Sequence, residues 1–282
     1  MPAKSTYVIV GASLAGAKAA ETLREEGFDG AVVLIGAEDQ LPYERPPLSK
    51  GYLLGKDARD SIFVHDAGWY PQHDVDLRLS TTVRSIDRLG HRVELAGGDQ
   101  VPYDRLLITT GASPRRLSIP GADLGGVQYL RSVQDSERLQ TALRGGGKVV
   151  IAGAGWIGLE TAAAAREYGC EVTIVEPEAE PLHRSVGPEL GEVFAKLHRS
   201  HGVTFRFGEG LSELTGSGGA VTAAVSSPIQ PAPATTTEPP PRSAAPRRSQ
   251  SSTVRRYRTP SRSAPGTLSC RGDAPVVISS RS

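Results

Sequence analysis

Cysteine, methionine and histidine are scarce in this chain of 282 residues, which contains two, one and six of them. The cysteines, Cys170 and Cys270, form no C-x-x-C pair, so we expect no redox-active disulfide and we expect Cys170 to be a small buried apolar residue. The histidines show neither metal-ligand spacing nor a partner nucleophile, and none is assigned a role: His65, His73, His91, His183, His198 and His201. The sequence therefore predicts no metal site.

Long apolar runs are also missing, and the short stretch between Met1 and an expected strand at Tyr7 leaves no room for a signal peptide. We therefore expect a cytoplasmic protein that does not contact a membrane. A hydrophobic fraction of 38% suits a globular body with up to two domains.

The net charge of +1 conceals an uneven distribution. Residues 226–282 carry nine arginines and no lysine against Glu238 and Asp273, a charge of +7 that leaves −6 for residues 1–225. This tail has ten prolines and twelve serines but no sustained apolar period, so it cannot bury enough surface to offset the entropy lost on ordering. We predict a disordered tail over 226–282 and an acidic body that does not bind nucleic acid.

Two glycine-rich turns stand out, Gly11-Ala-Ser-Leu-Ala-Gly16 and Gly153-Ala-Gly-Trp-Ile-Gly158. Each follows an expected apolar strand (7–10 and 148–152) and opens an Ala-rich helix (17–24 and 159–168). In such turns the first glycine bends the chain, the middle one lets the backbone approach a pyrophosphate, and the last lets helix pack on strand. Ser13 replaces the middle glycine of the first turn and narrows that approach. Two complete units predict two dinucleotide sites on one chain.

An acidic residue follows the second strand of each unit. Glu38 comes just after an expected strand at 31–35, and Glu176 directly ends an expected strand at 171–175. These positions match the distance of about twenty residues expected for a carboxylate that binds a ribose. Because a carboxylate favours a free 2′-hydroxyl, NAD rather than NADP is the expected nicotinamide dinucleotide.

Shorter patterns complete the expected organisation. Strands are predicted at 76–81, 83–87, 92–95, 106–109 and 203–207, and helices at 138–144 and 190–201. The last helix carries an apolar stripe at Leu190, Val193, Phe194 and Leu197. We expect an α/β fold with two Rossmann-like, three-layer dinucleotide-binding domains, the second inserted in the first. Their predicted bounds are 1–113 and 114–225, followed by the disordered tail at 226–282.

Several motifs occur together in a family-specific order. They are the Gly11–Gly16 turn, Leu41-Pro-Tyr-Glu-Arg-Pro-Pro-Leu-Ser-Lys50, Ile108-Thr-Thr-Gly-Ala112, Tyr129-Leu-Arg-Ser132 and Gly155-Trp-Ile-Gly-Leu-Glu160. In these motifs the chain, from residue 5 to about 225, resembles the FAD-dependent NADH:ferredoxin reductases of the putidaredoxin, rhodocoxin and biphenyl-dioxygenase type, in the pyridine nucleotide-disulfide oxidoreductase superfamily. The resemblance implies a flavoprotein oxidoreductase that passes a hydride from NADH to FAD and then electrons to a ferredoxin-type iron-sulfur partner serving an oxygenase.

The resemblance also implies roles for individual residues. For FAD it implies Gly11, Ser13, Leu14, Ala15, Gly16, Glu38, Arg45, Lys50, Val83 and Arg131. For NAD it implies Gly153, Gly155, Ile157, Gly158, Glu176 and Arg184. Lys50 and Glu160 are the implied catalytic residues: the ammonium would stabilise negative charge on the reduced flavin and the carboxylate would offset it.

The family continues with an Ala-Gly-Asp motif and a C-terminal domain that have no counterpart after residue 225. The resemblance therefore implies a C-terminally truncated chain with impaired activity, whose Arg-rich tail is read out of frame. One alternative is a non-enzymatic or inactive remnant in which residues 113–225 still bind NAD. A weaker alternative is a protein whose Arg-rich tail binds nucleic acid or acidic partners, because aromatic residues do not alternate with the arginines.

Overall fold

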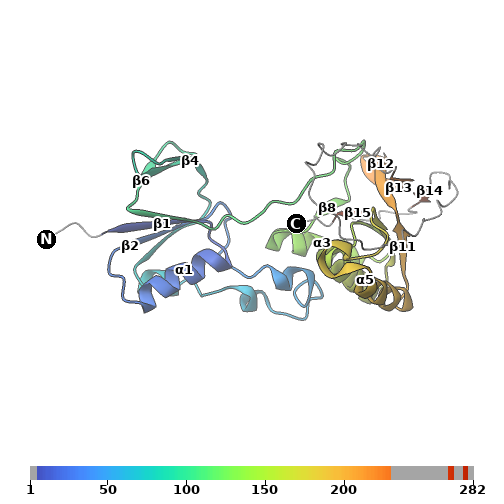
Figure 1. Cartoon of the computed structure of the whole chain (residues 1–282), viewed down its shortest axis with the longest axis horizontal. Coiled ribbons are helices and arrows are strands. Elements are labelled where there is room, and N and C mark those ends of the chain that lie inside the picture. Colours follow the sequence, from blue (N-terminus) through green and yellow to red (C-terminus); the bar gives the residue numbers. More distant parts are fainter. Residues whose placement is uncertain (1–4, 230–265, 270–275, 279–282) are drawn as a thin grey trace, which may run out of the picture.

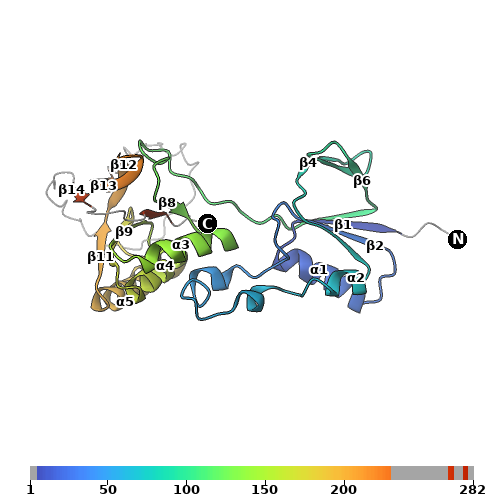
Figure 2. The same cartoon turned by 180° about the vertical axis from the view of Figure 1, so that it is seen from behind.

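The computed structural model describes residues 5–229, 266–269 and 276–278, which form two α/β units placed end to end along the longest axis (Figure 1). Two stretches of chain run between the units, one in blue and one in green, and both are visible again from behind (Figure 2). Over the described part of the chain, the structure contains no helix of the length and apolarity required to cross a membrane.

The first unit is built on a parallel sheet of order β3-β2-β1-β7. Its elements are β1 (Thr6–Val10), α1 (Leu14–Glu25), β2 (Ala31–Ile35), the 3₁₀ helices η1 (Pro46–Ser49) and η2 (Arg59–Ile62), α2 (Trp69–Gln72), β3 (Val75–Arg78), β4 (Val83–Asp87), β5 (Arg92–Leu95), β6 (Gln100–Pro102) and β7 (Arg105–Ile108). The central strands are near-continuous apolar runs because both of their faces are covered. Ile9 and Leu34 pack toward α1 and α2, whereas Val8 and Val33 pack against the antiparallel β4-β5-β6 sheet. The two helices, the parallel sheet and the antiparallel sheet therefore form three layers.

The second unit has a sheet of order β11-β10-β9-β15-β8 and an antiparallel sheet of order β12-β13-β14. Its elements are β8 (Val127–Tyr129), α3 (Val133–Arg144), β9 (Lys148–Ala152), α4 (Trp156–Glu167), β10 (Glu171–Glu176), α5 (His183–Ser200), β11 (Val203–Phe207), β12 (Glu209–Ser217), β13 (Ala220–Pro228), β14 (Gly266–Ser269) and β15 (Val276–Ile278). All strands of its main sheet are parallel. Cys170 is fully buried in the core of this unit, as expected, and burial raises the pKa of its thiol. Two Rossmann-like units are therefore confirmed.

Parts of the predicted disordered tail form strands. Residues 226–228 end β13, β14 pairs with β13, and β15 lies between β8 and β9 in parallel register. The prediction of disorder is corrected for these strands, because the backbone groups of β8 and β9 gain ladder partners that the tail's composition does not reveal. Residues 230–265, 270–275 and 279–282 of the predicted tail, which include Cys270, Glu238 and Asp273, lie outside the described residues.

Other differences concern where elements start and what they contact. Helices α1, α3 and α4 begin three to five residues before their predicted starts, because their first turns read as loop in sequence. Strand β3 ends at Arg78, three residues before its predicted end, and pairs with β2 in the main sheet. On α5, Leu190, Val193 and Leu197 are about half exposed, and the buried positions are Gly191 and Ala195. The expected apolar stripe thus lies largely on the surface.

A segment of the first unit packs into the core of the second. Tyr43, Leu48, Tyr52, Leu53 and Ile62 share one hydrophobic cluster with residues of α3, α4, β9 and β10. Polar contacts hold this segment in place: Ser136 Oγ donates to the Leu48 carbonyl at 2.8 Å and Gln140 Nε2 donates to the Leu53 carbonyl at 3.0 Å. This contact fixes the first unit's residues 43–62 against the glycine turn of the second.

Candidate cofactor-binding site

The first glycine turn is held rigidly at the carboxyl end of β1. Gly11 has a φ of +118°, and a Cβ there would lie 2.4 Å from the Thr109 carbonyl carbon. Thr109 Oγ1 donates to the Gly11 carbonyl at 2.8 Å and braces the turn. At Gly16 a Cβ would lie 2.1 Å from the Gly11 carbonyl oxygen, so this glycine lets α1 approach the strand. Both positions therefore require glycine for the reasons read from the sequence.

A cavity of about 210 Å³ opens beside this turn. It brings together five of the predicted FAD residues: Gly11, Ser13, Glu38, Arg45 and Val83. Leu14, Ala15 and Gly16 do not line it, because they start α1 behind the turn. The cavity lies at the carboxyl ends of parallel strands, where dinucleotides bind in such folds.

The Glu38 carboxylate is held on both of its oxygens. Arg45 Nη2 donates to Oε1 at 2.6 Å and the Tyr43 hydroxyl donates to Oε2. Tyr43 is almost completely buried, and burial raises its pKa above the ordinary tyrosine value, so its hydroxyl stays protonated and remains a donor. Tyr43 was missed by the sequence analysis, although it lies inside the motif quoted for Arg45 and Lys50.

The second glycine turn is more open. Gly153 has a φ of +99°, and a Cβ added at Gly155 would meet nothing within 4 Å. Gly155 also precedes the first residue of α4, whose N-terminal N–H groups suit an anion. A cavity of about 190 Å³ is lined here by Gly155, Ile157, Glu176 and Arg184. Gly158 is buried within α4 and does not line it.

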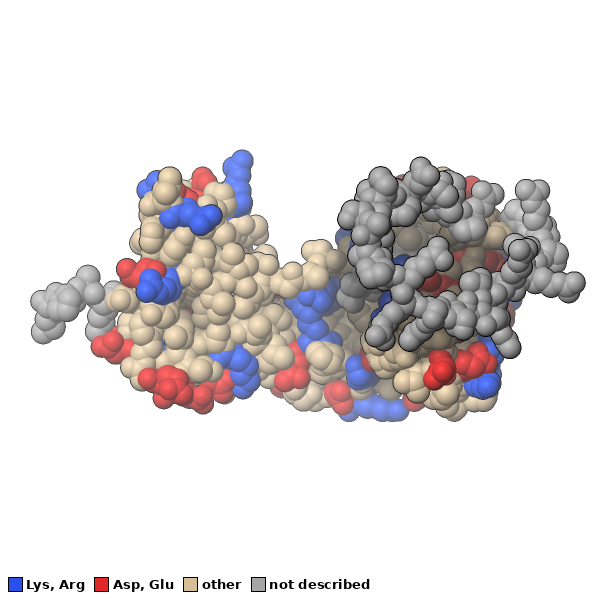
Figure 3. Space-filling model, viewed as in Figure 1, with Lys and Arg blue, Asp and Glu red and all other residues tan. Residues whose placement is uncertain are grey.

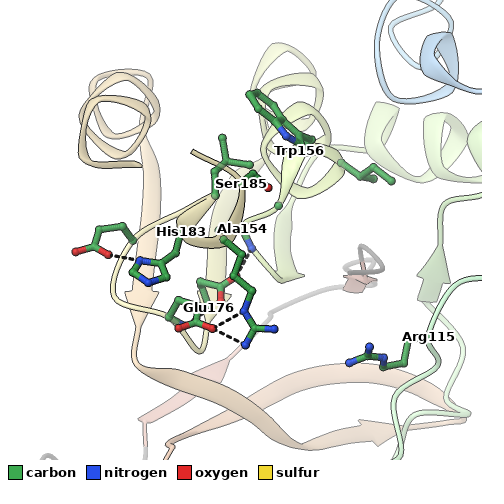
Figure 4. Close-up of a pocket in the computed structure, with 12 residues that line it drawn as sticks. Arg115, Ala154, Trp156, Glu176, His183 and Ser185 are labelled. Carbon is green, nitrogen blue, oxygen red and sulfur yellow. Dashed lines mark hydrogen bonds and ion pairs between the residues drawn. The ribbon is translucent and has the colours of Figure 1, made fainter. Parts of the chain in front are cut away.

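Acidic and basic side chains both line this second cavity, among them Glu176 and Arg115 (Figure 4). Glu176 is 3% exposed, and its carboxylate accepts from the N–H groups of Ala154 at 2.7 Å and Glu178 at 2.9 Å. Arg184 donates through Nε and Nη2 to Oε1 of Glu178, at 3.0 and 2.8 Å. Glu178 was not predicted; its sequence signal is a second acid two positions beyond the strand end.

A central cavity of about 260 Å³ lies between the two glycine turns. Its wall carries three cations, Arg45, Lys50 and Arg131, and one carboxylate, Glu160. Lys50 Nζ lies 2.9 Å from Glu160 Oε2, and the Ser49 hydroxyl donates to the same oxygen at 2.5 Å. Burial and the nearby Arg45 charge lower the pKa of Arg131. An excess of positive charge in a partly buried cavity favours an anionic ligand.

The three cavities adjoin one another. Arg45 lines both the first and the central cavity, and Trp156 and Ile157 line both the central and the second cavity. Figure 3 shows the narrow waist between the units, with Lys and Arg side chains gathered beside it. The central cavity therefore neighbours each of the cavities at the two glycine turns. Within the described residues, no cluster of three or more His, Cys, Asp or Glu side chains is placed to hold a metal ion.

Comparison with known sequences agrees with this geometry. A profile described as pyridine nucleotide-disulphide oxidoreductase matches residues 5–229. The chain belongs to this family. It is 40% identical over 214 residues to rhodocoxin reductase of Rhodococcus erythropolis, covering 76% of this chain and 50% of the relative. It is 43% identical over 201 residues to the ferredoxin–NAD(+) reductase component of the anthranilate 1,2-dioxygenase system of Burkholderia cepacia, covering 71% and 49%.

Among solved structures, the crystal structure of a covalent putidaredoxin reductase–putidaredoxin complex matches with a TM-score of 0.81 and 29% identity. The match covers 99% of this chain and 58% of that one. The fold and the family resemblance read from the motifs are thus confirmed. The chain spans about half the length of the curated relatives it matches.

Proposed function

We propose that this family member works as an FAD-dependent oxidoreductase that takes electrons from NADH and delivers them to a ferredoxin-type iron-sulfur protein serving an oxygenase. The observation that carries the proposal is the row of three neighbouring cavities that share lining residues, with a glycine turn at each end and the Lys50–Glu160 pair between them. Two dinucleotides bound in this way would meet at the central cavity. The similarity to a dioxygenase-system reductase component and to rhodocoxin reductase supports the acceptor class.

The residues present fit the two cofactors. Gly155 leaves open space where a pyrophosphate would approach, and Glu38 and Glu176 stand at the strand ends suited to ribose hydroxyls. For FAD we propose Gly11, Ser13, Leu14, Ala15, Gly16, Glu38, Arg45, Lys50, Val83 and Arg131. For NAD we propose Gly153, Gly155, Ile157, Gly158, Glu176 and Arg184. We retain residues 1–113 and 114–225 as the two cofactor domains.

When bound, FAD supplies two-electron acceptance from NADH and one-electron release to the partner. The chain's own contribution is to bind, orient and balance charge. The Lys50 ammonium offsets negative charge that gathers in the central cavity, and Ser49 holds the Glu160 carboxylate against that ammonium. Trp156 and Ile157 supply an apolar part of the wall at the junction. We also propose a cytoplasmic location, where NADH is available.

The purified full chain, mixed with FAD and separated from the excess, tests this proposal. We expect a yellow protein whose visible absorbance bleaches when NADH is added without oxygen and recovers when a ferredoxin is supplied. A chain that binds neither FAD nor NADH would overturn the proposal.

A second candidate is a nucleotide-binding protein without flavin chemistry. The second cavity is lined only by residues of the second unit, so NAD could bind there even if FAD did not bind. In the experiment above, NADH binding without flavin absorbance would favour this candidate.

A further inference from the structure

The wall of the second cavity contains an ion pair between Arg184 and Glu178. Arg184, in the first turn of α5, donates two hydrogen bonds to a single carboxylate oxygen of Glu178. The guanidinium is largely exposed and the Glu178 side chain is 28% exposed, so the pair sits at the rim where a ligand would enter. Both residues line the second cavity together with Glu176, which Figure 4 labels.

The neighbouring Glu176 is fixed by the main chain. Its carboxylate accepts from the N–H groups of Ala154 and Glu178, so it cannot swing away from the strand end. Glu176 and Glu178 together place two carboxylates on one side of the cavity. A ribose hydroxyl can donate to such a carboxylate, but a phosphate, with a charge of about −1.5 to −2 at neutral pH, is repelled by it.

We propose that Glu178 is the residue that makes this site select NADH over NADPH, by holding Arg184 away from the position of a 2′-phosphate. This inference rests on the proposed binding of a nicotinamide dinucleotide in the second cavity. Arginine is the side chain best suited to bind a phosphate, because its planar fork matches the oxygens. Glu178 accepts both hydrogen bonds from the Arg184 guanidinium and also adds negative charge to the cavity wall. One side chain therefore acts on selectivity in two ways.

The structure offers a matched control in the same cavity. Glu180 accepts from His183 Nδ1 at 3.0 Å, and both residues line the cavity beside Arg184. Glu180→Gln removes the same formal charge from the same wall without freeing Arg184. Comparing Glu178→Gln with Glu180→Gln therefore separates release of the arginine from a general change in charge.

The test is calorimetric titration of the full chain and its variants with NADH and NADPH. We expect Glu178→Gln to bind NADPH about tenfold more tightly than the unaltered chain, equivalent to ~1.4 kcal/mol, with NADH affinity changed by less than about threefold. Glu180→Gln should show no comparable gain. The double variant Glu178→Gln with Arg184→Gln should not bind NADPH more tightly than the unaltered chain, because the released guanidinium is then missing.

Equal gains in Glu178→Gln and Glu180→Gln would overturn the inference, since charge alone would then explain the result. So would an unchanged NADPH affinity in Glu178→Gln with NADH binding intact, while the proposed function would survive. If the unaltered chain bound neither dinucleotide, the proposed function would fail and this inference with it. Since Arg184 is largely exposed and Glu178 is partly exposed, each variant should keep the circular dichroism spectrum of the unaltered chain.

Discussion

Lys50 and Glu160 are 110 positions apart in the sequence, and their side chains meet at 2.9 Å across the junction of the two units. Lys50 ends the motif that begins at Leu41, and Glu160 ends the motif that begins at Gly155. Lys50 follows η1, which packs against α3 and α4, and Glu160 lies in the second turn of α4. The ion pair is therefore a product of how the two units dock.

Replacing Lys50 by methionine should slow NADH-dependent flavin reduction by about ten- to a hundredfold, because it removes a positive charge aimed at the central cavity. The apparent affinity for NADH should change little, since the ribose end of the site lies elsewhere. Single-turnover bleaching of flavin absorbance over a range of NADH concentrations separates the two effects.

Lys56→Met is the matched control for this experiment. Its ammonium pairs with Glu167 at 2.8 Å and also bridges the two units, but neither residue lines a cavity described above. Equal slowing in both variants would show that docking of the units, rather than the charge at Lys50, controls the rate.

Gly155→Ala should weaken NADH binding by at least about tenfold while leaving the thermal midpoint nearly unchanged. A methyl group at this position contacts no protein atom, but it projects into the space where a pyrophosphate would approach. Calorimetric titration with NADH and a thermal melt measure the two quantities. Gly97→Ala also places a methyl group in open space, but it lies in the first unit and does not line the second cavity, so it should alter neither quantity. A Gly155→Ala protein with unaltered NADH affinity would contradict the assignment of this turn.

Tyr43→Phe should weaken FAD binding by about tenfold, because Glu38 loses one of the two donors that fix its carboxylate. Arg45 also donates to the Tyr43 hydroxyl oxygen at 3.0 Å and would lose that partner. Flavin fluorescence on titration measures the affinity. Tyr70→Phe is the control: its hydroxyl is buried and, among the described atoms, makes no hydrogen bond. If both variants bound FAD as the unaltered chain does, Tyr43 would have no part in the site.

Stability should fall at alkaline pH partly through Tyr52. Its hydroxyl donates to Glu137 at 2.7 Å, and burial, followed by that hydrogen bond, raises the pKa of Tyr52 to about 12. Because the folded-state pKa lies above the unfolded value of about 10, the stabilisation is complete below pH 10 and is lost as the pH rises toward 12.

Chemical unfolding between pH 8 and pH 12 tests this prediction. Tyr43 and Tyr70 also have raised pKa values, so the unaltered chain should lose stability steeply in this range. Tyr52→Phe should have a shallower decline, and the difference should total about 2–3 kcal/mol. Parallel curves for the two proteins would rule out ionisation of Tyr52 as a source of the loss.

Much of both glycine-turn units could be predicted from the sequence because their signals are local. Gly155 of the second glycine turn and Glu176 lie within one strand-helix-strand stretch, and the structure brings both to one cavity. Strands at 31–35, 148–152 and 203–207 were predicted with the bounds observed, since each is a short apolar run between turn residues.

The remaining features depend on partners that are distant in sequence. Nothing near Tyr52 or Leu53 indicates that they pack against α3 and α4, because those helices follow roughly eighty or more positions later. The placement of β3 beside β2 and of β15 between β8 and β9 is likewise set by pairing. Ser49 was assigned no role within its motif, and only the fold brings its hydroxyl to Glu160.

The docking of residues 43–62 into the second core defines what can be exchanged between relatives. A chimera joined at residue 113 would transplant α3, α4 and the second glycine turn without Leu48 and Leu53, which fill their surface. Its apolar contacts would then be mismatched, at a cost of about 2–5 kcal/mol for each large side chain left without its cavity partner. The transplantable module is therefore discontinuous: residues 43–62 must travel with the second unit.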